Sequence, residues 1–205
     1  MRIGGLLPVS LSDFPGRVAA VVFTQGCNFR CPFCHNGELI PMHPPAHTQM
    51  SEDDLFVTLS ERATRLDGVM VTGGEPTLQP DLSGFLTRVR ALGLETGIET
   101  NGSRPDVLAE LISGRLLDFI AMDIKAPLET YPRLCGVDFP TEPICESIAL
   151  IAESGIEHQF RTTHVPALLS ETDLDAIRLL VPTGSPHVIQ PFIPEHALDP
   201  KLREV

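Results

Sequence analysis

Six short apolar runs alternate with amphipathic stretches along this chain, and this alternation restricts the fold more than any other feature of the sequence. The runs span residues 18–24, 68–72, 94–100, 117–124, 158–165 and 187–192. The first of them, VAAVVFT, is apolar at both odd and even positions, which is typical of a strand buried on two faces. We therefore predict six strands of a parallel sheet, joined by right-handed crossovers.

Helix signals lie between these runs. One predicted helix begins at Ser51, an N-cap followed by three acidic residues that favour the positive end of the helix dipole. Another begins at Ser170, with Asp173 placed three residues on as in a capping box, and runs to residue 180. Further helices are expected over 82–92, 106–113 and 144–153, and the proline-rich residues 40–50 are expected to form a loop.

The number of strands and the chain length together predict the architecture. A closed eight-stranded barrel of strand–helix units normally needs about 250 residues, whereas this chain has 205 residues and six such units. We expect an α/β fold, namely a partial, open (β/α)6 TIM-type barrel with parallel strands, formed by a single domain over residues 1–205. An open side would let a large substrate reach a site that a closed barrel hides.

Composition narrows the classes of function. The formal net charge is −12, so the surface repels phosphate backbones and nucleic-acid binding is not expected. The longest clean apolar run, residues 18–23, is far too short to span a membrane. The first 16 residues contain no uninterrupted apolar stretch like that of a signal peptide. We therefore expect a cytoplasmic protein with no membrane association.

Three cysteines crowd into one loop directly after the first predicted strand. Cys27, Cys31 and Cys34 form the pattern C-x3-C-x2-C. In a chain without a secretory signal such cysteines are metal ligands more often than disulfide partners. Thiolates suit iron–sulfur clusters and zinc. A four-iron cluster would be left with one open iron, whereas zinc would need a fourth ligand, which Cys135 or Cys145 could supply.

Other polar motifs fall at the carboxyl ends of the predicted strands, where barrel enzymes build their active sites. They are Thr72-Gly73-Gly74-Glu75-Pro76, Glu99-Thr100-Asn101-Gly102, Asp123-Ile124-Lys125, Arg161-Thr162-Thr163 and Gln190-Pro191-Phe192. Each motif alone has an ordinary structural explanation, such as a tight turn or a solvated ion pair. Their common placement on one rim of the sheet indicates a functional site.

These motifs together resemble those of the radical S-adenosylmethionine superfamily. C-x3-C-x2-C with an aromatic residue, Phe33, before the last cysteine is the most specific of them. The segments SLSDFPG at 10–16, QGCNFRC at 25–31 and AMDIK at 121–125 are similar to those of anaerobic ribonucleoside-triphosphate reductase activating proteins. They also resemble segments of pyruvate formate-lyase activating enzymes.

The resemblance implies roles for the residues on the rim. Cys27, Cys31 and Cys34 would hold a [4Fe–4S] cluster, whose open iron would bind S-adenosylmethionine. Phe33 would lie near the adenine, and the segment Gly73-Gly74-Glu75 would meet the methionine amino group. The ribose, carboxylate or substrate region would be reached by Asp123, Lys125 and Arg161, and Asn101 would offer an amide for polar contacts. Related enzymes have an acid at the position of Glu99 in a cation site beside the cofactor.

The reaction implied by the resemblance begins with one electron entering the cluster and passing to the sulfonium. The S–C5′ bond breaks, and the 5′-deoxyadenosyl radical removes a hydrogen atom from a glycine Cα of a partner protein. The implied partners are a glycyl radical enzyme, resembling anaerobic ribonucleotide reductase, and a reduced flavodoxin- or ferredoxin-like electron donor. The protein itself would orient the cofactor and exclude quenching groups.

Two alternatives remain open from the sequence. One is a radical enzyme that acts on a small molecule, similar to 7-carboxy-7-deazaguanine synthases. Those enzymes generally carry a wider insertion in the cysteine loop, whereas the loop here is compact. The other is a non-catalytic zinc-binding scaffold, which predicts a colourless protein that contains zinc and no iron.

Overall fold

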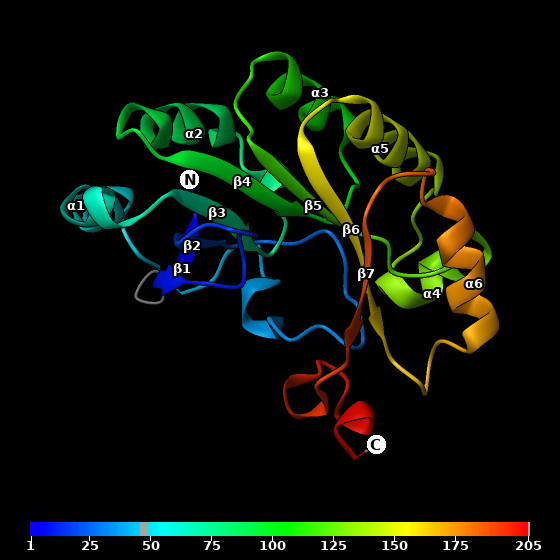
Figure 1. Ribbon diagram of the computed structural model, residues 1–205. Coiled ribbons are helices and arrows are strands. Elements are labelled where there is room, and N and C mark those ends of the chain that lie inside the picture. The colour runs from blue at the N-terminus through cyan, green and yellow to red at the C-terminus, as the bar shows by residue number, and fades with distance from the viewer. Residues whose placement is uncertain (46–48, 205) are drawn as a thin grey trace.

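The computed structural model describes residues 1–45 and 49–204 and contains one seven-stranded sheet whose strands lie side by side in sequence order (Figure 1). The strands are β1 (Ile3–Ser10), β2 (Ala19–Thr24), β3 (Gly68–Gly73), β4 (Glu95–Thr100), β5 (Phe119–Asp123), β6 (Glu157–His164) and β7 (His187–Pro191). Strands β2 to β7 are parallel, so all six predicted strands and their direction are confirmed.

The sheet has one edge strand more than the six that were predicted. Strand β1 pairs with β2 in antiparallel orientation and was not expected from the sequence. Its residues, IGGLLPVS, include two glycines and a proline, which are depleted in strand interiors. Pro8 has no backbone N–H group to donate. An edge strand such as β1 tolerates this, because only one of its two sides makes hydrogen bonds with a neighbouring strand.

The crossover helices are α1 (Glu52–Arg62), α2 (Leu82–Ala91), α3 (Pro105–Ser113), α4 (Tyr131–Cys135), α5 (Glu142–Glu153) and α6 (Glu171–Leu180). The predicted caps are confirmed: Ser51 accepts a hydrogen bond from Asp54 N, and Ser170 forms a capping box with Asp173. The short helix α4, after the turn Leu128–Thr130, was not predicted. Of the predicted loop over 40–50, residues 46–48 lie outside the described residues.

The sheet separates two apolar layers. The larger layer lies between the strands and the helices, which cover the outer, convex face of the sheet (Figure 1). The smaller layer fills the concave face and is centred on Phe14, which packs with Met70 and Phe119. Gly68 and Gly97 leave room for this core, because a Cβ at either position would lie 2.9 Å or less from Met70 or Phe14. Phe14 thus fills the concave side near the amino ends of the strands and leaves the space near their carboxyl ends open.

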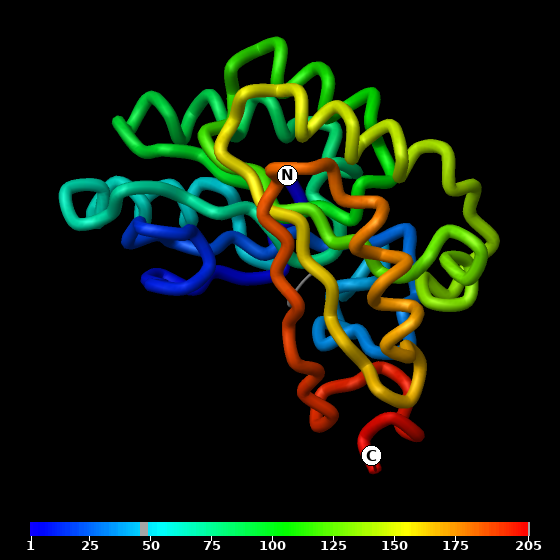
Figure 2. Tube along the Cα trace, turned by 45° about the vertical axis from the view of Figure 1, so that its right-hand side comes forward, coloured from blue at the N-terminus to red at the C-terminus, as the bar shows by residue number. Residues whose placement is uncertain are grey.

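The sheet curves but does not close into a barrel. Strands β1 and β7 are its two edges and do not pair with each other, and they lie apart in Figure 1. Figure 2 shows the segment that follows β7, in red, extending below the rest of the chain. The predicted open, partial barrel is therefore confirmed. None of the described helices combines the length and apolar character needed to cross a bilayer.

Candidate active site

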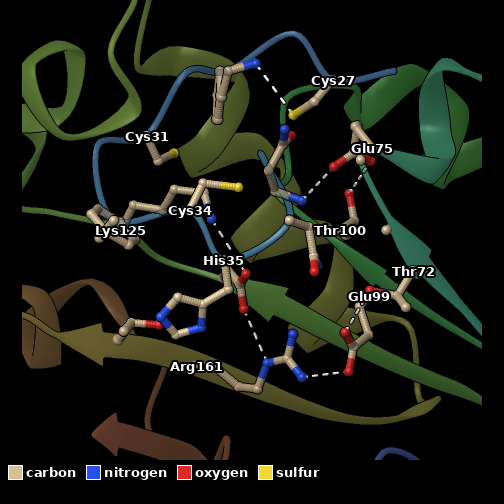
Figure 3. Close-up of a pocket in the computed structure, with 18 of the residues that line it drawn as sticks. Cys27, Cys31, Cys34, His35, Thr72, Glu75, Glu99, Thr100, Lys125 and Arg161 are labelled. Atoms are coloured by element: carbon tan, nitrogen blue, oxygen red, sulfur yellow. Dashed lines mark hydrogen bonds and ion pairs between the residues drawn. The ribbon is translucent and has the colours of Figure 1, made fainter. Parts of the chain in front are cut away.

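A cavity of about 310 Å³ lies where the cysteine loop faces the carboxyl ends of β3 to β7 (Figure 3). This volume is at the lower end of the range for small-molecule sites, roughly 300–1,000 Å³. Every residue predicted from the sequence as a site residue lines this one cavity. They are Cys27, Cys31, Phe33, Cys34, Gly73, Gly74, Glu75, Glu99, Asn101, Asp123, Lys125 and Arg161.

The three cysteines are free thiols, and their sulfur atoms point into the same space in Figure 3. Contacts from three distant segments fix the backbone of their loop. Cys27 N donates to Ile40 O at 3.1 Å, and Arg30 N donates to Cys135 O at 2.7 Å. Asp199 N donates to Pro32 O at 2.8 Å. Helix α4 and the segment 194–204 therefore support the loop, a role that their sequences do not signal.

Burial keeps the thiols of Cys27 and Cys31 protonated in the absence of a metal. Desolvation, together with the nearby charge of Glu75, raises the pKa of Cys27 to about 11. Desolvation raises the pKa of Cys31 to about 12. Because thiolate is the form that binds metal, loading of this loop must release protons.

The arrangement of the thiols fits a cluster better than a single zinc ion. Within residues 1–45 and 49–204, no three His, Cys, Asp or Glu side chains converge closely enough to hold one metal ion. A structural zinc ion needs four ligands around one point, with each sulfur at about 2.3 Å. The cysteines of a cubane bind different iron atoms, so they do not need to converge on one point.

Glycines bring the end of β3 against the cysteine loop. Gly73 has φ of 108°, a conformation that favours glycine. Gly74 N donates to Thr24 O at 2.8 Å, and Glu75 N donates to Gly26 O at 2.8 Å. The backbone of this segment therefore lies directly beside the residue that precedes Cys27, and it lines the cavity.

The Glu75 carboxylate is completely buried and internally satisfied. It accepts hydrogen bonds from Thr77 N and Oγ1 at 3.1 and 2.6 Å, from Thr100 Oγ1 at 2.7 Å and from Asn101 N at 2.7 Å. Desolvation raises its pKa in spite of these bonds. Because four donors converge on the Glu75 carboxylate, it holds the segment after β3 against the segment after β4.

Asn101 extends this network to the cysteine loop. Its Nδ2 donates to Asn28 Oδ1 at 2.9 Å, and Asn28 Nδ2 in turn donates to Ser103 Oγ at 2.9 Å. Asn28 lies directly after Cys27 in the chain. Sequence reasoning missed Asn28, although its place inside the C-x3-C-x2-C motif was a usable signal.

Charged side chains line the opposite wall. Arg161 reaches both Glu99 and Asp123, and Lys125 Nζ donates to Asp123 Oδ2 at 3.3 Å. Burial opposes ionisation of Asp123, but the charges of Arg161 and Lys125 hold its pKa below the usual value. Burial likewise opposes the charge on Lys125, but Asp123 keeps the pKa of the ammonium raised. This wall therefore presents a permanently charged lysine beside the thiols.

The structure adds cavity residues to which sequence reasoning gave no role. Asp13, His35 and Thr163 are among them. His35 stacks on Phe192, and its buried Nε2 is without a hydrogen-bond partner among the described residues. No sequence signal pointed to His35, because its spacing from Cys34 does not suit a shared metal ion.

Comparison with known proteins agrees with this geometry. A sequence model of the Radical SAM superfamily matches residues 21–180. A protein of Methanocaldococcus jannaschii, provisionally named a glycyl-radical enzyme activating enzyme, is 31% identical over 99% of this chain and 85% of its own length. The pyruvate formate-lyase-activating enzyme of Listeria monocytogenes is 35% identical over 60% of this chain and 53% of its own length.

Two further comparisons cover smaller parts of the relatives. The 7-carboxy-7-deazaguanine synthase of Halobacterium salinarum is 40% identical, but over only 43% of this chain and 33% of its own length. Streptococcus suis SuiB bound to S-adenosylmethionine has a similar fold, with a TM-score of 0.64 at 14% identity over 88% of this chain and 44% of that chain. Apart from the M. jannaschii protein, this chain spans about half or less of these relatives.

Proposed function

This chain belongs to the radical SAM superfamily, and from that premise we propose that it is an activating enzyme that generates a glycyl radical on a partner protein. The superfamily uses a [4Fe–4S] cluster and S-adenosylmethionine, as predicted from the cysteine motif. The observation that carries the proposal is the match to the M. jannaschii relative over nearly the whole of both chains.

The cavity residues divide into two groups in this proposal. Cys27, Cys31 and Cys34 hold the cluster, and the chemistry that the bound cluster supplies is one-electron reduction of S-adenosylmethionine. The backbone beside Gly74 receives the methionine amino group, and Lys125 pairs with the methionine carboxylate. Phe33 is buried and lines the cavity, which suits contact with the adenine ring.

The protein substrate approaches from the side where the sheet is open. The edges β1 and β7 do not meet, so a loop of a partner protein can enter a cavity that two further strands would otherwise cover. The electron donor is proposed to be a flavodoxin- or ferredoxin-like protein, because the cluster must be reduced before each turnover.

Electron paramagnetic resonance tests this function. The anaerobically reconstituted protein is mixed with reductant, S-adenosylmethionine and a candidate glycyl radical enzyme from the same genome. The expected result is a doublet from a glycyl radical, with deoxyadenosine formed in step with it. The doublet should disappear when the glycine of the partner is replaced by alanine or when Cys31 is replaced by alanine.

A small-molecule reaction is the second candidate, favoured by the local 40% identity to the H. salinarum synthase. That match covers less than half of this chain, and the compact cysteine loop differs from the wider loop expected of such enzymes. If the protein cleaves S-adenosylmethionine but gives no doublet with any glycyl radical enzyme of its genome, this second candidate replaces the first.

A further inference from the structure

The cavity wall holds an arginine clamped between two carboxylates. Arg161 Nη1 lies 2.5 Å from Glu99 Oε1, and Arg161 Nε lies 3.0 Å from Asp123 Oδ1 (Figure 3). The side chains of Arg161 and Glu99 are only 11% and 13% exposed. The planar guanidinium has several N–H groups in a fixed fork, so it binds both acids at once.

The sheet register explains how one arginine reaches two strands. Arg161 on β6 pairs with Asp123 on β5, and Glu99 on β4 pairs with Ala121 on β5. Residues that pair across neighbouring strands lie on the same face of the sheet. The methyl group of Ala121 is small, so the arginine can cross β5 above it and reach β4.

The remaining oxygens of both acids also have donors. Thr72 Oγ1 donates to Glu99 Oε2 at 2.7 Å, and Lys125 Nζ donates to Asp123 Oδ2 at 3.3 Å. Two carboxylates therefore face two cations and a hydroxyl. The resemblance to activating enzymes implies a cation site at Glu99, but the place of such a cation is filled here by the guanidinium.

We propose that Arg161 is a built-in substitute for a metal cation at this wall. In the native protein no metal ion binds between Glu99 and Asp123, and Arg161 is a positioning residue that fixes Asp123 and, through it, Lys125. Removal of the guanidinium leaves the Glu99 carboxylate, 13% exposed, and the Asp123 carboxylate, 34% exposed, without the cation that bridges them. Oxygen ligands of this kind bind hard cations such as Na⁺, K⁺ and Mg²⁺, so the variant acquires a cation site that the native protein lacks.

The chain contains a matched control at the opposite ends of the same strands. Arg17 also bridges two carboxylates, at 2.7 Å to Glu95 and 2.8 Å to Glu157. Those two side chains are 46% and 52% exposed, so water can solvate them after the arginine is removed. Loss of Arg17 therefore creates no cation site.

The test is thermal unfolding of the full chain, before and after cluster reconstitution, in choline, sodium, potassium or magnesium chloride at matched ionic strength. Choline is too large to enter between the acids. The Tm of Arg161→Met should rise by roughly 3–5 °C in at least one metal salt, the shift expected for a site about nine-tenths filled. The native protein and Arg17→Met should show the same Tm in all four salts.

Two results would overturn the proposal. One is a metal-specific rise of Tm in the native protein that Glu99→Gln abolishes. The other is an Arg161→Met variant that folds but does not distinguish the salts. If the Arg161→Met variant does not fold, the ²³Na NMR line width is measured with the native protein instead. Saturable broadening of the ²³Na line that is lost in Glu99→Gln would overturn the proposal. A native protein that causes no such broadening would support it.

Discussion

Replacement of Gly74 by alanine should damage both the stability of this protein and its cofactor site. An added Cβ would overlap the Gly26 carbonyl oxygen, and it would lie 2.6 Å from Gly26 C and 3.0 Å from Leu39 O. All three atoms belong to the backbone, so no side-chain rotation relieves the overlap. The segment after β3 must therefore move away from the cysteine loop by roughly 1 Å to regain normal contacts.

The size of the effect follows from the bonds that such a movement breaks. Both Gly74 N to Thr24 O and Glu75 N to Gly26 O are 2.8 Å long, and neither survives a 1 Å separation. Each is worth about 0.5–1.5 kcal/mol, and a buried group left without a partner adds about 1–3 kcal/mol. We expect the free energy of unfolding to fall by about 2–4 kcal/mol.

Urea denaturation of the cluster-free chain measures this loss, and calorimetric titration of the reconstituted protein measures the affinity for S-adenosylmethionine. Gly84→Ala is the control, because Gly84 lies within α2 and an added Cβ meets nothing within 4 Å. That variant should gain about 0.5–1 kcal/mol, since alanine favours helix over glycine. Equal stability and equal affinity of Gly74→Ala and the native protein would refute the steric argument.

Three further predictions concern the same site. Cys31→Ala should retain far less iron after anaerobic reconstitution than Cys145→Ala, because Cys145 is exposed on α5 and away from the cavity; iron and sulfide analysis distinguishes them. Glu75→Gln should lower the free energy of unfolding by about 1–3 kcal/mol, because the NH₂ group of glutamine would face one of the four groups that donate hydrogen bonds to Glu75. An unchanged midpoint of urea denaturation would contradict this. The pKa values of Cys27 and Cys31, about 11 and 12, lie above the ordinary value of 9.0. The stabilisation from burying neutral thiols is therefore complete below pH 9 and is lost as the pH rises toward 11. The cluster-free native chain should lose more stability between pH 8 and 10 than a Cys27→Ala/Cys31→Ala variant, as urea denaturation can show.

Much of the fold was predictable because the responsible signals are local. Strands such as β2 are apolar at both odd and even positions, and N-cap residues such as Ser51 and Ser170 act within one helical turn. Strand β1 was not predictable in this way. Its proline and glycines argue against a strand, and pairing with β2 at the sheet edge, a contact between separate segments, stabilises it.

The sequence by itself determined which motifs line the cavity at the strand ends, because parallel strands place their carboxyl ends on one rim and the motifs at those ends must meet there. Only the tertiary structure decided what those residues contact. Arg161 and Glu99 are separated by an intervening strand, and Glu75, which follows β3, accepts a hydrogen bond from Asn101, which follows β4. Such contacts depend on sheet register and on the space left by small residues such as Ala121, and neither is encoded in any short stretch of chain.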